Sequence, residues 1–176
     1  MTPIELVHKT NLDELRKLCR FPMDRDTKIN HVDGLIDLCN HVVTKDMTIV
    51  ELGTYEGVST AVFSHFAKFV TTYDLDMRIA PSLEGLSNVR RVQGDSCQAA
   101  QPYQDRSVDL VYLDTDHRYN QVMRELMAWT KKVKPGGYIA GHDFQADPGV
   151  EVIKAVCDRF DYPDRIYSDS SWIIRL

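Results

Sequence analysis

The segment VELGTYEGVST, residues 50–60, decides how the rest of the chain folds. A mostly apolar run ends at Leu52 and contains one acid, Glu51. Gly53 and Gly57 follow before a helical pattern begins. Glycines at a strand-to-helix corner let a ligand approach the backbone and the N–H groups of the helix N-terminus. The spacing differs from the G-x-G-x-x-G of a dinucleotide fold, and an acid beside the corner would repel a pyrophosphate. The corner therefore favours a ligand with a cationic amino acid end.

Alternating strand and helix patterns extend along the chain from this corner. Runs that are apolar throughout predict strands at Thr48–Leu52, Phe69–Tyr73, Val89–Val92, Val108–Leu113 and Tyr138–Ala140. Helical spacing predicts helices over Gly57–Lys68 and Tyr119–Lys132, and a third that opens at the N-cap Asp147 with Pro148 in its first turn. Buried strands separated by helices indicate an α/β fold with a parallel sheet covered on both faces.

The two ends of the chain depart from this alternation. The first 45 residues have helical spacing, with Asn11 and Thr27 as the N-caps of two predicted helices. Near the C-terminus, Arg165–Tyr167 and Trp172–Arg175 predict two short strands around a polar turn at residues 168–171. A terminal hairpin appended to a parallel sheet is not a feature of a plain dinucleotide fold.

Composition narrows the class of protein. The length of 176 residues suits one domain, and a formal net charge of −5 argues against a general nucleic-acid binder. The four cysteines are scattered without a C-x-x-C pair, and three of them fall in apolar-periodic segments, which predicts core thiols in a reducing compartment. The N-terminus lacks a signal-peptide pattern, and no apolar run approaches the ~20 residues of a membrane span. We therefore expect a cytoplasmic protein without membrane contact.

Polar residues at successive strand ends describe a single ligand. Asp74 ends the second strand at roughly the ~20-residue distance at which an acid holds ribose hydroxyls. Asp95 and Ser96 follow the third strand, where a carboxylate and a backbone N–H can bind a base edge. A ribose, a base and a charged amino acid at Glu51 together describe S-adenosylmethionine.

With these motifs the sequence resembles the class I S-adenosylmethionine-dependent methyltransferases over about residues 48–176, and the segment 50–60 is similar to the cofactor loop of catechol O-methyltransferase and related small metal-dependent O-methyltransferases. The resemblance implies a Rossmann-like, doubly wound, seven-stranded sheet, mostly parallel with an antiparallel C-terminal hairpin strand. It also implies that residues 1–45 form a helical region on the substrate side of one domain, 1–176, whose cofactor-binding core is 48–176. The expected cofactor-binding residues are Glu51, Gly53, Thr54, Tyr55, Gly57, Ser59, Asp74, Asp95, Ser96 and Asp114.

Two further clusters carry the expected chemistry. Asp114-Thr115-Asp116-His117 follows the fourth strand, and Gly141-His142-Asp143 follows the fifth, after a predicted turn at residues 134–137. The carboxyl ends of strands are where open α/β sheets bind ligands. By resemblance, Asp114, His142 and Asp143 would hold a divalent cation, magnesium or, because of the histidine, manganese. His117 occupies the position of the family's general base, and an ordinary imidazole pKa near ~6.5 suits that role.

The same residues also suit structural roles. Asp116 and His117 are also suited to cap the helix that begins near Arg118, and His142 to be an internally hydrogen-bonded histidine at a strand end. Asp114 is harder to explain in this way, because a carboxylate directly after the buried run VDLVYL needs a partner or a ligand.

The function that these features favour is O-methylation of a small hydroxylated acceptor, a sugar or a phenol. Two alternatives stay open: an NAD- or nucleotide-sugar-linked enzyme on a similar fold, and a non-catalytic module that binds S-adenosylmethionine. The N-terminal helices and the segment between Asp74 and Val89 are short. We therefore expect an open pocket, which a second copy of the chain in a homodimer would complete.

Overall fold

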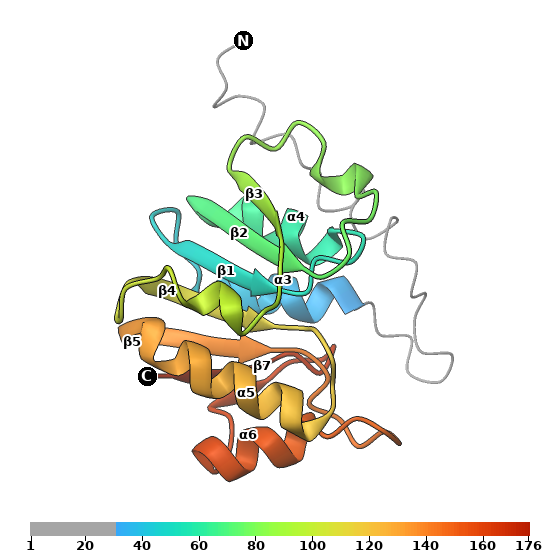
Figure 1. Cartoon of the computed structure of the whole chain (residues 1–176), viewed down its shortest axis with the longest axis vertical. Helices are drawn as coiled ribbons and strands as arrows, with labels where there is room; N and C mark the ends of the chain where they lie inside the picture. The colour runs from blue at the N-terminus through green and yellow to red at the C-terminus, as the bar shows by residue number, and fades with distance from the viewer. Residues whose placement is uncertain (1–30) are drawn as a thin grey trace.

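The computed structural model describes residues 31–176, which form one mixed seven-stranded sheet between two layers of helices (Figure 1). The strands are β1 Thr48–Leu52, β2 Phe69–Asp74, β3 Val89–Gln93, β4 Val108–Leu113, β5 Val133–Gly141, β6 Arg165–Ile166 and β7 Trp172–Arg175. The α-helices are α3 His31–Val42, α4 Val58–Phe66, α5 Tyr119–Trp129 and α6 Val152–Phe160. Single 3-10 turns occur at η1 Pro81–Leu83, η2 Gln98–Ala100 and η3 Thr130–Lys132. The first predicted helix, capped by Asn11, and the predicted start of the second at Thr27 lie outside the described residues.

The strand order is β3-β2-β1-β4-β5-β7-β6, and it confirms the predicted fold class. Strands β1 to β5 pair in parallel, whereas β7 pairs antiparallel to both β5 and β6. The chain leaves β1 toward β2 on one side and returns to β4 on the other. The carboxyl ends of β1 and β4 therefore lie side by side where the winding reverses, and such a switch point is where these sheets bind ligands.

Alternate residues of the central strands point to opposite faces of the sheet and build two cores. In β4, Leu110 and Tyr112 pack with α3 and α4, whereas Val111 and Leu113 pack with α5 and α6. Figure 1 shows α5 and α6 together on one face of the sheet and α3 with α4 on the other. Burial on both faces explains why these strands have no polar alternation.

The predicted start of α6 is wrong. The helix begins at Val152 with Glu151 as N-cap, not at Asp147. The carbonyl of Asp147 instead accepts a hydrogen bond from the Val150 N–H at 3.1 Å, across a turn in which Gly149 has φ +86°. A residue in the left-handed region cannot continue a helix. The Asp-Pro pair therefore belongs to a reverse turn that precedes the helix.

Other boundaries also differ from the prediction, and α4 ends at Phe66 instead of Lys68. Strand β5 begins at Val133, and the predicted turn at residues 134–137 is instead an irregularity within it, because the pairing with β4 shifts register between Val108 and Leu110. Gly136 has φ +77° within this irregular stretch. Helix α5 ends at Trp129 and continues as η3. Among the described residues, no helix combines the length and the apolar character needed to cross a bilayer.

Candidate functional site

The glycine corner after β1 packs directly against the end of β4. Gly53 has φ +98°, and a Cβ placed on it would lie 1.9 Å from the carbonyl oxygen of Asp114. The Asp114 N–H donates to the carbonyl of Leu52 at 2.8 Å. Only glycine combines this backbone conformation with so close an approach. The corner therefore fixes Asp114 beside the start of α4.

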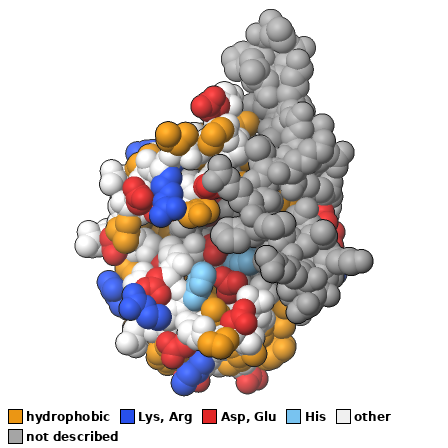
Figure 2. All heavy atoms as spheres, turned by 90° about the vertical axis from the view of Figure 1, so that its right-hand side faces the viewer, with side chains coloured by type: hydrophobic (Ala, Val, Ile, Leu, Met, Phe, Trp, Pro, Cys, Tyr) orange, Lys and Arg blue, Asp and Glu red, His pale blue; other side chains and the backbone are white. Residues whose placement is uncertain are grey.

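A cavity of about 460 Å³ opens between this corner, α3 and the ends of β4 and β5. Six of the expected cofactor residues line it: Gly53, Thr54, Tyr55, Gly57, Ser59 and Asp114. The lining also contains His117, His142, Asp143 and Asp169, and Val32 and Leu35 of α3 contribute apolar surface. Figure 2 shows histidine and acidic side chains side by side on the face at the carboxyl ends of the strands.

Glu51 lies behind the corner and has no exposed surface. The Thr60 hydroxyl donates to its Oε2, whereas its Oε1 is buried and has no hydrogen-bond partner among residues 31–176. Burial disfavours the charged form and raises the pKa of Glu51 to about 7. A buried acceptor without a donor favours a ligand that brings an N–H group or an ammonium.

The side chains of the other expected cofactor residues, Asp74, Asp95 and Ser96, form hydrogen bonds with other residues of the chain. Asp74 Oδ2 accepts from the N–H groups of Thr54 and Tyr55 at 2.9 and 2.8 Å, so this carboxylate holds the glycine corner. Asp95 Oδ1 accepts from the N–H groups that open η2. Ser96 is buried, and its hydroxyl donates to Glu125 Oε1 at 2.5 Å. Four expected cofactor residues therefore lie outside the lining of the cavity: Glu51, Asp74, Asp95 and Ser96.

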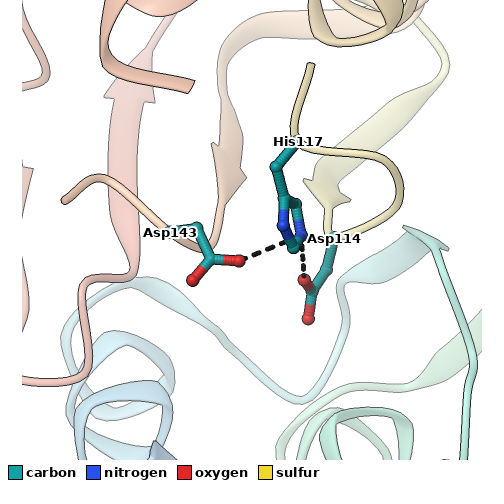
Figure 3. A group of neighbouring side chains, drawn as sticks. All are labelled: Asp114, His117 and Asp143. Carbon is teal, nitrogen blue, oxygen red and sulfur yellow. Dashed lines mark ion pairs between the residues drawn. The ribbon is translucent and has the colours of Figure 1, made fainter. Parts of the chain in front are cut away.

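Asp114, His117 and Asp143 converge at the cavity wall (Figure 3). His117 Nε2 lies 2.9 Å from Asp143 Oδ2 and 3.6 Å from Asp114 Oδ1. Among residues 31–176, Nε2 makes no hydrogen bond of regular angle, so its contacts with these two oxygens are ion pairs. One ligand atom from each residue lies within 4.8 Å of the others, a spacing that can hold a metal ion.

This group takes its imidazole from His117, whereas the sequence predicted His142 as the third ligand. His142 lies next to the group, with Nδ1 3.3 Å from Asp143 Oδ1, and also lines the cavity. Asp143 has φ 58° and Tyr55 has φ 45°, both uncommon for residues other than glycine. Two such residues in the lining of one cavity are typical of a functional site, because the surrounding structure must stabilise the backbone there.

The protonation states of the histidines and carboxylates in this cluster depend strongly on one another. The carboxylates of Asp114 and Asp143 raise the pKa of His117 to about 10. Burial opposes the charged form of His142, but the contact with Asp143 and the charge of Asp114 outweigh it and raise its pKa to about 9. Both imidazoles hold the pKa of Asp143 far below its usual range, against the effect of its burial. The expectation of an ordinary pKa for His117 is therefore wrong: without a metal ion this histidine is protonated at neutral pH.

The start of α5 is held by a residue that is distant in the sequence. Arg118 is the N-cap, and Asp116 accepts from the Arg118 N–H at 3.0 Å instead of capping the helix itself. Glu151 accepts from the Tyr119 N–H at 2.9 Å, and the Glu151 N–H donates to the His117 carbonyl at 2.8 Å. Asp116 therefore binds the N–H that directly precedes α5, close to the structural role considered for it, whereas the His117 side chain lines the cavity and caps nothing.

Asp169 is a cavity residue that the sequence analysis missed. It lies in the turn between β6 and β7, is 4% exposed, and accepts from the N–H and the hydroxyl of Ser171. A signal for it existed, because the predicted antiparallel hairpin places the turn before Trp172 beside the carboxyl end of β5. The observed pairing of Gly141 with Trp172 has this geometry.

Comparisons with known proteins agree with this architecture. An uncharacterized protein of Acanthamoeba polyphaga mimivirus is 30% identical over 131 residues, which are 65% of this chain and 59% of that protein. The chain therefore spans about 59% of the length of this curated relative. A TDP-rhamnose 3'-O-methyltransferase of calicheamicin biosynthesis has a TM-score of 0.59 at 16% identity, over 98% of this chain and 93% of its own. A methyltransferase of the mycinamycin pathway, in complex with Mg, S-adenosylhomocysteine and mycinamycin VI, has a TM-score of 0.59 at 18% identity, over 93% and 54% of the two chains.

Likeness to solved structures at these identities shows the fold, while the sequence itself shows the family. Residues 50–144, from the glycine corner to just beyond Asp143, match the family described as a methyltransferase domain. That range contains the glycine corner and the carboxyl ends of β2 and β3. It also contains Asp114, His117, His142 and Asp143. The chain belongs to this methyltransferase domain family.

Proposed function

We propose that this chain is an S-adenosylmethionine-dependent methyltransferase that methylates a hydroxyl group of a small acceptor. The observation that carries the proposal is the position of Asp114, His117 and Asp143 in the wall of a cavity whose other side is the glycine corner. A donor bound at the corner and an acceptor bound at the cluster would meet within one enclosure. Holding two reactants in this way can supply about 7–11 kcal/mol of the barrier in the best cases.

The residues at the corner fit this cofactor. When bound, S-adenosylmethionine supplies a methyl group on a sulfonium that is open to in-line attack. Within residues 31–176, Oε1 of Glu51 is buried and receives no hydrogen bond, so it can accept one from the amino group of the cofactor. Gly53 has no side chain to separate the ligand from the end of β4. We assign Tyr55 and Ser59 to the same methionine end, and Asp74, Asp95 and Ser96 to the ribose and adenine side. Binding of the ribose by Asp74 would require this carboxylate to share its hydrogen bonds with Thr54 and Tyr55.

The cluster also fits a divalent cation. Two carboxylates and one imidazole provide two oxygen ligands and one nitrogen ligand, a set that suits manganese better than magnesium. A cation held there would polarise the acceptor hydroxyl. Ligation requires neutral His117, so its proton must leave first. We assign Asp114, His117 and Asp143 as the ligands in place of the predicted set with His142, and we assign His142 to orient Asp143. This arrangement is the basis for proposing a metal-dependent enzyme.

His117 acts as a general base only in its neutral form. At neutral pH its neighbours keep it protonated, so His117 alone would favour orienting an acceptor oxygen over removing its proton. Without metal, the rate of methyl transfer should rise only at pH well above 7, where His117 loses its proton. With manganese bound, the rate should rise at lower pH. Both results together would support the proposed roles of His117 and the cation.

The acceptor that we propose is neutral and hydroxylated, such as a sugar. Asp114, Asp143 and Asp169 line the acceptor side of the cavity together with His117 and His142, whose raised pKa values keep them protonated, so the opposite charges largely offset one another and suit a neutral, hydrogen-bonding group. The similar structures include enzymes that act on TDP-rhamnose and that bind mycinamycin VI, and this likeness supports a sugar hydroxyl.

Two measurements test the proposal in sequence. Calorimetric titration with S-adenosylhomocysteine, with and without Mn²⁺ or Mg²⁺, should give micromolar binding that Glu51→Gln weakens. Transfer of labelled methyl from S-adenosylmethionine should then be measured on a panel of sugars, phenols, amines and RNA. We expect product from a hydroxylated small molecule, with a loss of about 10²-fold or more in Asp143→Asn. The exposed carboxylate Asp147 provides a matched control, Asp147→Asn, that should retain full activity.

Each contrary result points to a different function. Cofactor binding without methylation of any acceptor would favour a non-catalytic binding module. Binding of NAD or of a nucleotide sugar, in place of S-adenosylhomocysteine, would overturn the proposal. Methylated RNA as the only product would remove the small-molecule acceptor but keep the methyl transfer.

A further inference from the structure

Glu125 is a buried acid at the centre of a hydrogen-bond network that joins two loops of the site. It lies in the middle of α5 and is 1% exposed. Its Oε1 accepts hydrogen bonds from the Ser96 hydroxyl at 2.5 Å, the Thr115 hydroxyl at 2.6 Å and the Gln121 amide at 2.9 Å. All three donors are neutral, and no salt bridge to Glu125 occurs within residues 31–176.

The two hydroxyls belong to loops that follow neighbouring parts of the sheet. Ser96 lies after β3, on the side proposed for adenine, and Thr115 directly follows Asp114 at the end of β4. Trp129, one turn after Glu125 on α5, donates its Nε1–H to the Ser96 carbonyl at 2.8 Å. Helix α5 therefore holds the β3 loop at two points and the β4 loop at one. Glu125 is the side chain common to both loops.

This arrangement does not contribute much to the free energy of folding, so stability alone does not explain it. Burial of a carboxylate among neutral donors is unfavourable, and a well-packed apolar side chain of similar size is often neutral or stabilising at such positions. What the carboxylate provides is geometry, since one oxygen fixes the relative positions of three donors. Gln121, four residues earlier on the same helix, supports this by holding the Glu125 side chain in one orientation.

We infer that Glu125 is a positioning residue that holds the Ser96 loop and the Asp114–His117 loop in a fixed relation, so that the cofactor side and the acceptor side of the cavity stay aligned. The inference rests on the proposed methyl transfer, in which donor and acceptor must meet in line. Misplacement of reacting groups by about 1 Å can cost on the order of 10²-fold in rate. Glu125 itself does not line the main cavity, so it acts through the loops and not on a substrate.

The test compares three variants of the full chain. Glu125→Leu removes the carboxylate acceptor and replaces it with an apolar side chain of similar size. Glu125→Gln restores one acceptor oxygen. Leu126→Ala is the matched control, because Leu126 is the next residue on α5, is 0% exposed, and packs in the apolar core. The readouts are the Kd for S-adenosylhomocysteine, kcat and KM for the best acceptor, and thermal unfolding.

We expect Glu125→Leu to weaken S-adenosylhomocysteine binding by about tenfold and to lower kcat by 10- to 100-fold. Glu125→Gln should recover most of both losses. Leu126→Ala should lower the unfolding temperature while keeping Kd and kcat near their original values at a temperature where it is folded. If folded Glu125→Leu keeps both constants, or if Leu126→Ala lowers them equally, the positioning role is overturned.

Amide hydrogen exchange separates this inference from the proposed function, because it needs neither cofactor nor acceptor. Glu125→Leu should speed exchange in both residues 94–97 and residues 114–118, and Leu126→Ala should not do so selectively. Selective loosening of both loops in a chain that fails to bind S-adenosylhomocysteine would leave the link between the loops intact and overturn the proposed function alone. Unchanged exchange in both loops would overturn the inference whatever the activity.

Discussion

A carboxylate with no exposed surface, such as Glu51, couples the stability of the fold to pH. Its pKa in the folded chain is raised to about 7 by burial, whereas in the unfolded chain it returns to the ordinary value of about 4.5. Between these values the unfolded chain loses the proton while the folded chain keeps it. The contribution of the neutral carboxyl is therefore fully present below pH about 4.5 and is lost as pH rises through about 7.

The variant Glu51→Gln should remove this dependence. We expect the free energy of unfolding of the variant, relative to the original chain, to increase by roughly 3 kcal/mol between pH 4.5 and pH 8. Urea unfolding at several pH values measures it, with Glu84→Gln as a control at an exposed acid on the same half of the molecule. Parallel curves for Glu51→Gln and the original chain would show that Glu51 is ionised normally in the folded state.

Gly53 tests the close approach of the corner to β4. Gly53→Ala would place a Cβ 1.9 Å from the Asp114 carbonyl oxygen at a residue with φ +98°, so both backbone strain and a steric clash follow. Gly85→Ala is the matched control, because Gly85 has φ +77° and no atom of the described part of the chain lies within 4 Å of the added Cβ. We expect the control to cost about 1 kcal/mol and Gly53→Ala to cost several. S-adenosylhomocysteine titration should show binding lost only in Gly53→Ala; equal stability losses would contradict the clash.

At the scale of elements, the start of α5 depends on a residue outside the helix. Glu151→Ala removes the acceptor for the Tyr119 N–H and should destabilise the chain by about 1 kcal/mol, as the loss of a helix cap does. Glu151→Gln keeps an acceptor oxygen and should lose much less. Chemical denaturation of both variants measures the difference. Two variants of equal stability would show that solvent satisfies this N–H as well as Glu151 does.

Elements whose pattern is local were predictable from the sequence. Strands β1 to β4 and the terminal hairpin follow from short apolar runs and a polar turn, and the central corner follows from Gly53 and Gly57. The predicted start of α6 at Asp147 was wrong because Asp-Pro opens both helices and reverse turns, and the φ of Gly149 decides between them. The irregular start of β5 depends on its pairing with β4, which no local pattern encodes.

The cavity shows the same division between local and long-range information. Asp114 and Asp143 were predictable as cavity residues because each lies within two residues of the carboxyl end of a buried strand. The partners of these residues were not, since the choice of His117 over His142 depends on the turn after β4 and on how Glu151 holds it. Glu125 and Asp169 were missed because an acid within an amphipathic helix and an acid in a polar turn are both ordinary at surfaces. Only the packing of α5 and the pairing of β7 bury them.

At the scale of the whole molecule, the strand order explains why one end of the sheet carries the chemistry. The central strands β1, β4 and β5 are consecutive in the sheet, so the corner and both polar clusters share one edge although 92 positions separate Glu51 from Asp143. A ligand at this edge contacts segments from both helix layers. Its binding should therefore stabilise the entire fold against unfolding, by about 2.7 kcal/mol at a concentration of 100 times Kd.

This linkage gives a pH-dependent prediction for Mn²⁺. Because the pKa of folded His117 is about 10, the histidine carries a proton throughout the range from pH 6 to pH 8 and must release it to ligate the cation. The apparent affinity should therefore rise about tenfold per pH unit across this range, as for any ligand that displaces one proton. The rise in unfolding temperature with Mn²⁺ should grow accordingly, vanish in Asp143→Asn, and persist in Asp147→Asn. An affinity that does not change between pH 6 and pH 8 would show that Mn²⁺ binds without His117, and the proposed ligand set would be wrong.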